Sequence, residues 1–127
     1  MITARVFVLC NDMVQHAPGY FDIKGVTQMI RAEGFPVTID EMLLCILSDV
    51  RETTKLTVEL LDASSLETIG RREVGGTNFN REGAAILRIP FSHQFTKSGL
   101  YIFRLCEGAE IAAEWDLEIM ENQHSNS

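Results

Sequence analysis

A chain of 127 residues with 46% apolar residues is large enough for one globular domain with a single hydrophobic core. The formal net charge of −7 argues against nucleic acid and anionic membranes as partners, because an acidic surface repels phosphate groups. A basic protein partner, or one without charge, fits this surface better.

The N-terminal half is predicted to consist of strands separated by irregular segments. The apolar run over residues 3–11 is typical of a strand covered on both faces. Residues 11–22 contain a Pro-Gly pair and are predicted to be a loop, with a short edge strand as the alternative. Residues 26–31 favour a strand, although their apolar spacing also suits a short helix. Residues 42–50 are predicted to form a central strand.

The next segments predict a hairpin, a long loop and an edge strand. Residues 56–62 alternate between apolar and polar and lead into a turn at residues 63–65, so a second strand is expected to pair with them. Residues 75–84 form the longest loop by composition. A strand resumes over residues 85–91, and Pro90 places it at a sheet edge because proline cannot donate to a ladder.

After a linker over residues 92–99, the chain predicts a second hairpin. Its apolar residues are all odd-numbered: Tyr101, Phe103, Leu105, Ala109, Ile111, Ala113, Trp115, Leu117 and Ile119. Opposed residues of a hairpin lie on the same face, so the connecting loop needs an odd number of residues. A three-residue turn over residues 106–108, with a left-handed Gly108, meets this requirement.

This turn fixes a register for the hairpin. The pairs Leu105–Ala109, Phe103–Ile111 and Tyr101–Ala113 are expected on the core face, Arg104–Glu110 outside, and Trp115 opposite Gly99. The outward row of the last strand is then acidic, with Glu110, Ala112, Glu114, Asp116 and Glu118. As charges on an edge, these discourage stray strand pairing.

The cysteines indicate a reducing compartment. Cys10, Cys45 and Cys106 are odd in number, and each lies in an apolar run, as free buried thiols do. The apolar run after Arg5 is too short for a secretory signal, and no run is long enough to cross a membrane. We therefore expect a cytoplasmic protein.

Chemistry-bearing residues are few and lack recognisable motifs. Cys10, Asp12, His16 and Asp22 lie near the end of the first strand, but without a CxxC or HExxH pattern. Ser92 and His93 are adjacent in the sequence, but no oxyanion motif that nucleophilic catalysis would need lies beside them. No catalytic residue, metal or cofactor is therefore expected.

Several short motifs follow one another along the chain: Leu-Cys followed by Asp, Gly-Val, Phe-Pro, and Gly-x-Tyr-x-Phe at residues 99–103. Together they resemble a family of small, uncharacterised bacterial proteins. The resemblance implies an immunoglobulin-like sandwich in the cytoplasm and supplies no catalytic residue. Asn11 stands between Cys10 and Asp12, which departs from the family pattern.

We therefore predict an immunoglobulin-like antiparallel β-sandwich of about seven or eight strands over residues 1–120, with a polar tail over residues 121–127. The expected function is a non-enzymatic binding or accessory module that acts on a protein through loops or strand edges. The expected exposed contacts are Tyr20, Phe21, Asn78, Phe79 and Arg81.

Two other functions remain open at this point. One is a small metal-binding protein or enzyme that uses Asp12, His16 or His93. The other is a structural subunit that self-assembles into homo-oligomers through its strand edges.

Overall fold

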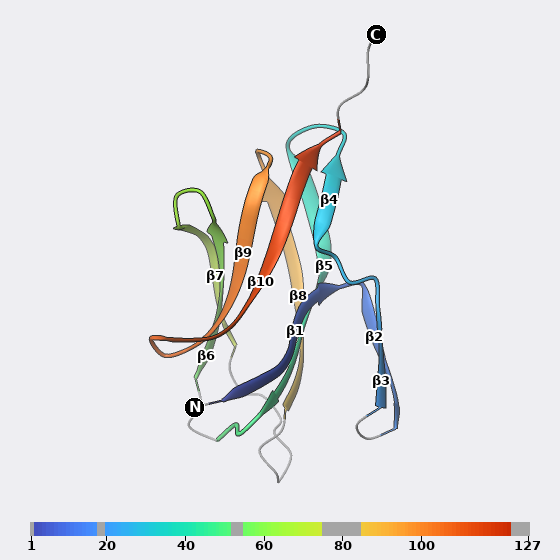
Figure 1. Ribbon diagram of the computed structural model, residues 1–127, viewed down its shortest axis with the longest axis vertical. Coiled ribbons are helices and arrows are strands. Elements are labelled where there is room, and N and C mark those ends of the chain that lie inside the picture. Colours follow the sequence, from blue (N-terminus) through green and yellow to red (C-terminus); the bar gives the residue numbers. More distant parts are fainter. Residues whose placement is uncertain (1, 18–19, 52–54, 75–84, 123–127) are drawn as a thin grey trace.

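The described part of the chain contains ten strands, which form two sheets and a separate hairpin (Figure 1). The computed structural model describes residues 2–17, 20–51, 55–74 and 85–122, and no helix occurs among them. None of this described chain forms a helix of the length and apolarity that a membrane crossing needs.

The smaller sheet has three antiparallel strands in the order β1-β5-β8. They are β1 (Thr3–Cys10), β5 (Val37–Ser48) and β8 (Ala85–Phe95). The central strand β5 includes residues 42–48 of the strand predicted over residues 42–50, and it begins five residues earlier than predicted. Strand β8 lies at the edge of this sheet, as Pro90 predicts.

The larger sheet has five strands in the order β4-β10-β9-β6-β7. They are β4 (Met29–Ala32), β6 (Leu56–Asp62), β7 (Glu67–Val74), β9 (Gly99–Glu107) and β10 (Glu110–Glu121). Strand β4 pairs parallel with β10, whereas the other described pairs of this sheet are antiparallel. The strand predicted over residues 26–31 exists as β4 but begins at Met29, and the hairpin around residues 63–65 is confirmed.

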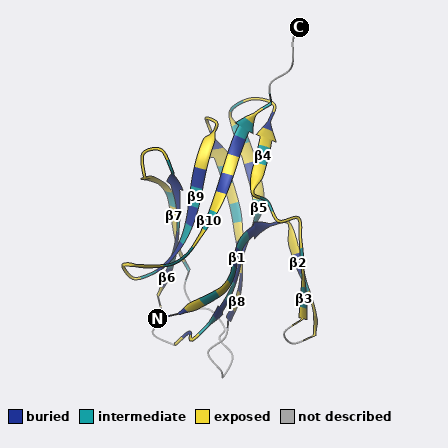
Figure 2. Cartoon of the chain, viewed as in Figure 1, coloured by how far each residue is buried: buried dark blue, intermediate teal, exposed yellow. Residues whose placement is uncertain are grey.

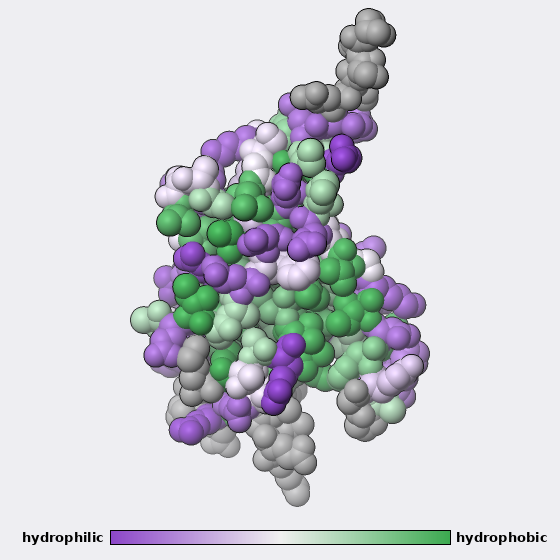
Figure 3. Space-filling model, viewed as in Figure 1, coloured by the Kyte–Doolittle hydropathy of each residue, from purple (hydrophilic) through white to green (hydrophobic). Residues whose placement is uncertain are grey.

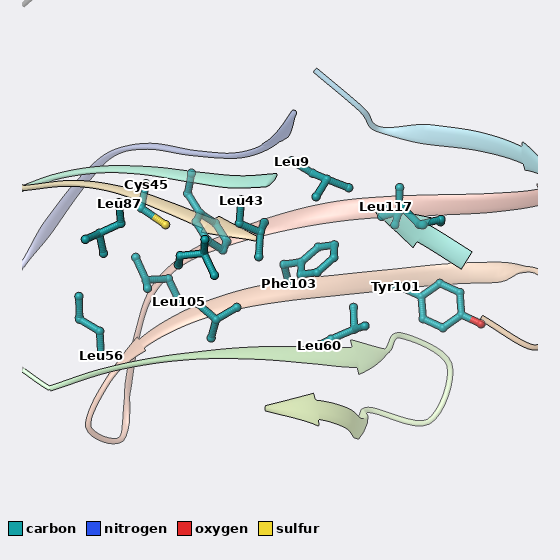
Figure 4. Packing of buried hydrophobic residues seen from close by; sticks show 14 of the residues in the cluster. Leu9, Leu43, Cys45, Leu56, Leu60, Leu87, Tyr101, Phe103, Leu105 and Leu117 are labelled. Carbon is teal, nitrogen blue, oxygen red and sulfur yellow. The ribbon is translucent and has the colours of Figure 1, made fainter. Parts of the chain in front are cut away.

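The core fills the space between the two sheets, and Phe103 and Leu105 of β9 point across this space toward Leu43 of β5 (Figure 4). Phe103 and Leu105 are fully buried. Residues along β9 and β10 alternate between buried and exposed for much of their length (Figure 2), which is the pattern of strands with one face on a core.

Tyr101 ties the start of β9 to the corner that precedes it. Its hydroxyl donates a hydrogen bond to the Lys97 backbone oxygen at 2.7 Å, and its ring packs edge-on against Phe95. A tyrosine that bonds backbone a few residues upstream is the tyrosine corner of immunoglobulin-like sandwiches. The predicted all-β sandwich is confirmed, with ten strands instead of seven or eight.

Residues 11–22, predicted to be a loop, instead belong largely to a β-hairpin. Strand β2 (Asp12–Ala17) pairs antiparallel with β3 (Tyr20–Lys24). Met13 is buried against Cys10 and Leu44, because the outer face of the smaller sheet is apolar and needs a cover. Figure 3 shows hydrophobic side chains over β1 and between β1 and this hairpin.

The predicted linker over residues 92–99 is also shorter than expected, because β8 continues to Phe95. In the tail, Glu121 ends β10 and the Asn122 amide donates to the Ala32 backbone oxygen at 2.7 Å. The remainder of the tail lies outside the described residues.

The hairpin of β9 and β10 exists, but its predicted register is wrong. The connecting loop holds two residues instead of three. A bulge between Ile111 and Ala113 supplies the extra residue that brings the odd-numbered side chains of the two strands onto the same face. Before the bulge Ile111 opposes Cys106, so it lies on the outer face and not on the core face with Phe103.

Beyond the bulge the pairs are Ala113–Leu105, Glu114–Arg104, Trp115–Phe103, Leu117–Tyr101 and Ile119–Gly99. The predicted partners of Leu105, Phe103, Tyr101, Arg104 and Gly99 are therefore all replaced. Arg104 bonds Glu114 instead of Glu110, with 2.6 Å between Nε and Oε2. The left-handed conformation of Gly108 is confirmed by its φ of 59°.

Candidate functional site

A groove opens where the edge of the larger sheet approaches the edge of the smaller one. It has a volume of about 190 Å³ and is lined by β7 on one side and β8 on the other. Its lining includes the core residues Leu43, Leu60 and Phe103, so the groove reaches the hydrophobic interior of the sandwich. A concave site with an apolar floor and a few polar groups at its mouth is the usual form of a binding pocket.

Gly70 keeps this groove open. It lies on β7 opposite Leu60, at a position whose side chain faces the core. A Cβ atom placed there meets the Leu60 Cβ at 3.7 Å, which is an ordinary van der Waals contact. The backbone therefore accommodates a larger residue, and it is the missing side chain that leaves the space.

Aromatic rings form part of the groove floor. Phe91 packs edge-on against Phe103 with 4.8 Å between the ring centroids. His93 follows on the same face of β8, with its ring stacked 6.2 Å from that of Phe91. The phenylalanine rings offer an apolar surface, and the imidazole nitrogens of His93 provide polar groups beside it.

Arg72 crosses the groove from one sheet to the other. Its Nη1 donates a hydrogen bond of 3.0 Å to the backbone oxygen of Pro90 on β8. The side chain is exposed, so this bond exchanges readily with bonds to water or to another acceptor. Arg72 is therefore a removable contact at the mouth of the groove.

A second hollow of about 240 Å³ continues along β8 on the far side of Arg72. Its lining includes Ile86 and Arg88 of β8 and Glu73 of β7. Arg88 lies on the opposite face of β8, where its Nη2 is 3.8 Å from the Met13 sulfur. The two hollows together follow β8 from Ile86 to His93, roughly 25 Å of extended chain at about 3.3 Å per residue.

The loop residues expected to make contacts are not all placed by the structure. Tyr20 is 60% exposed at the tip of the β2–β3 hairpin. Phe21 is half-buried against the cluster under this hairpin and is not fully exposed. Asn78, Phe79 and Arg81 lie outside the described residues.

The hairpin also brings His16 and Asp22 together. Their Nε2 and Oδ2 atoms are 2.6 Å apart, and both side chains are about half exposed. Asp12 instead accepts a hydrogen bond from the Met13 backbone amide, which is a local turn contact. Among the described residues no group of three or more histidine, cysteine or acidic side chains is arranged to hold a metal ion.

His93 lies far along the chain from these residues, in the groove beside Ser92. The sequence instead predicts a linker at these two residues, because the strand was expected to end at residue 91. The groove itself was missed, although the glycine in β7 and the proline in β8 are both visible in the sequence. Their juxtaposition across two sheets has no signal in local periodicity.

Burial makes the three thiols poor nucleophiles. Cys10, Cys45 and Cys106 are free and buried, as the sequence predicts. Desolvation raises the pKa of Cys45 to about 12 and also raises the pKa of the other two. Because the thiolate is the reactive form, these cysteines are structural.

Asp62 is the one buried charged residue of the described chain, at the turn after β6. Hydrogen bonds from the Ser64 side chain, from Lys97 and from the Ser64 backbone amide lower its pKa from 3.8 to about 2. The Lys97 Nζ is 2.9 Å from the carboxylate. This arrangement holds the turn and the β8–β9 corner together, and every partner of Asp62 is internal, so it does not form a site.

No protein-family model and no curated protein sequence matches the chain. Among solved structures, one similar chain is described as an immunoglobulin-like protein from Pseudomonas aeruginosa. The two are 13% identical with a TM-score of 0.48, over 94% of this chain and 96% of the other. At this identity and TM-score, nothing is carried over from that chain to this one.

Proposed function

We propose that this chain is a non-enzymatic binding module that holds a segment of a partner protein in the groove between β7 and β8. The observation that supports the proposal is the continuity of the groove with the core at Leu43, Leu60 and Phe103. These three side chains are themselves buried, so the apolar surface left for a partner at the groove is chiefly that of the half-buried Phe91 and His93. Covering it stabilises the complex by about 25 cal/mol per Å².

The polar groups at the groove favour binding over catalysis. Arg72, Ser92 and His93 line it, but none of them makes the nucleophile–base hydrogen bond that covalent catalysis needs. Hydrogen-bonding groups around an apolar floor instead fix the orientation of a bound segment.

A site-specific photo-crosslink tests this function. The photoreactive residue p-benzoylphenylalanine replaces His93, whose half-exposed ring lies on the groove face of β8, and separately Asp116, which is exposed on the outer face of β10. We expect a discrete protein adduct in the native host from the position of His93 and not from that of Asp116. Its loss in the background of Gly70→Val, which fills the groove, would assign it to the groove.

Thr68→Val is the matched control, since it adds an apolar methyl group to an exposed position of the same strand. It should leave the adduct unchanged. Equal adducts from both crosslinker positions, or an adduct that survives Gly70→Val in a folded protein, would contradict the proposed function.

The cellular setting belongs to the same proposal. We place the protein in the cytoplasm, where a reducing environment keeps its three buried thiols free. We also propose that the chain is related to the small bacterial proteins with an immunoglobulin-like sandwich that its motifs resemble. The Gly-x-Tyr-x-Phe segment that begins β9 supports this proposal.

A further inference from the structure

We infer that the partner segment binds as an added strand on the edge of β8 and carries acidic side chains; this inference rests on the function proposed above. It goes beyond that function because it names the conformation and the charge of the ligand. It also reverses the expectation of a basic or uncharged partner that the net charge of −7 suggests.

The backbone of β8 is available for an added strand. Among the described residues, β8 pairs with β5 alone. The Pro90 oxygen accepts from Arg72 and therefore points away from β5. Because alternate residues of an antiparallel strand direct both backbone groups to the same side, Ile86, Arg88 and Ser92 present theirs to the same free edge.

The groove floor suits the side chains of such a strand. Every second side chain of an added strand faces inward, over Phe91 and Phe103. The cavity of about 190 Å³ is similar in size to protein cavities of about 150 Å³ that accept a benzene molecule. It therefore accepts one large apolar side chain of the segment.

Two arginines lie at this edge although the chain is acidic, and the acidic Asp40 of the neighbouring strand β5 lies opposite Ser92. Arg72 and Arg88 flank β8 on its two faces, and within the described residues neither has a carboxylate partner. Arg71 lies opposite Glu59 on the outer face of the larger sheet. Glu73 is the one carboxylate among the residues that line the two hollows, and it lies opposite Thr57 on that same outer face.

An acidic side chain gains more from Arg72 than the present partner does. The guanidinium now bonds a neutral backbone oxygen, and a carboxylate is the stronger acceptor because the bond is charge-assisted on both sides. A glutamate of the segment on the opposite face reaches Arg88 in the same way. The pattern expected of the segment is therefore an apolar anchor with acidic residues around it.

Three designed peptides test the inference. Each has about ten residues, enough to span the edge, with one central phenylalanine as the anchor and with glutamate, glutamine or lysine on both faces of the extended peptide. Fluorescence anisotropy gives their affinities, and amide shifts of the isotope-labelled protein give the binding site. We expect the glutamate peptide to bind at least about tenfold more tightly than the lysine peptide, with shifts at Ile86, Arg88 and Ser92.

Arginine substitutions separate charge from folding. Arg72→Gln and Arg88→Gln should each weaken binding of the glutamate peptide by about five- to tenfold while leaving the glutamine peptide unchanged. Arg31→Gln is the matched control, because it removes the same charge from the exposed surface of β4 at the other edge of the larger sheet. It should leave both affinities within about twofold.

Several results would overturn the inference. Equal affinity for the glutamate and lysine peptides refutes the charge, and shifts confined to strands other than β7 and β8 refute the site. If no peptide binds while the crosslink at His93 still captures a protein, the acidic strand is wrong and the proposed function stands. If that crosslink is lost as well, both are refuted.

Discussion

Two isoleucines of β10 give a direct test of the bulge that divides this strand. Ile111 and Ile119 are both odd-numbered, and a regular hairpin with an odd loop places both on the core face. In the structure Ile119 is 1% exposed, whereas Ile111 precedes the bulge and is 48% exposed. Ile111→Ala and Ile119→Ala therefore make the same chemical change in two different environments.

The expected costs differ by more than the error of the measurement. Removing the buried carbons of Ile119 costs about 2.5 kcal/mol of transfer free energy, and the cavity left behind brings the range to about 2–5 kcal/mol. Ile111 leaves no cavity and loses about half of the transfer free energy, so its substitution costs about 1 kcal/mol. The loss of β propensity is common to both substitutions.

Urea unfolding of both variants measures this difference. With a slope of about 2 kcal/mol per M, Ile119→Ala lowers the midpoint by about 1–2.5 M and Ile111→Ala by about 0.5 M. Equal losses for the two variants would show that Ile111 faces the core. The bulge, and the outward placement of Ile111 that follows from it, would then be wrong.

Three further predictions concern single residues. The pKa of Asp62 is lowered from 3.8 to about 2, so its contribution to stability is present above pH 4 and is lost as the pH falls toward 2. The unfolding free energy of the wild type should therefore fall more steeply in this pH range than that of Asp62→Asn. Burial raises the pKa of Cys45 to about 12, so this thiol should resist iodoacetamide at pH 8 in the folded protein and react once urea exposes it. Mass spectrometry of the alkylated protein measures the difference, and rapid labelling of the folded protein would contradict the burial of Cys45. Gly25→Ala should lower the melting temperature clearly, because φ is 64° and a Cβ atom there meets Asn11 at 2.8 Å, whereas Gly34→Ala has open space and should change it little.

The class of the fold follows from periodicity along the chain. Strands such as β5 and β6 are predictable because their side chains alternate or are apolar throughout, and turn residues separate them. Pro90 also places β8 at an edge, since a residue without an N–H group cannot serve a strand that is paired on both sides. These signals are local, and each depends on a few neighbouring residues.

The errors arise where one extra residue or one distant surface decides the outcome. The odd parity of the β9–β10 hairpin is satisfied by a bulge near Ala112 as well as by a three-residue turn, and the residue pattern is compatible with both. The β2–β3 hairpin forms because Leu44 and Cys10 expose an apolar outer face, which no pattern within residues 11–22 reveals.

The same distinction between local and distant arrangement applies to charge. On the outer face of the larger sheet, positive and negative side chains alternate across four neighbouring strands. Arg71 lies opposite Glu59, Glu59 opposite Arg104, and Arg104 opposite Glu114, so their charges compensate one another. The net charge of −7 counts these residues together with all others. A bound segment instead senses charges within about a Debye length, roughly 8 Å in physiological salt. At the edge of β8 these include Arg72 and Arg88 together with Glu73, which lines the same hollow, and Asp40, which pairs with Ser92. The two arginines have no carboxylate partner among the described residues, and the proposal of an acidic segment rests on them and not on the net charge.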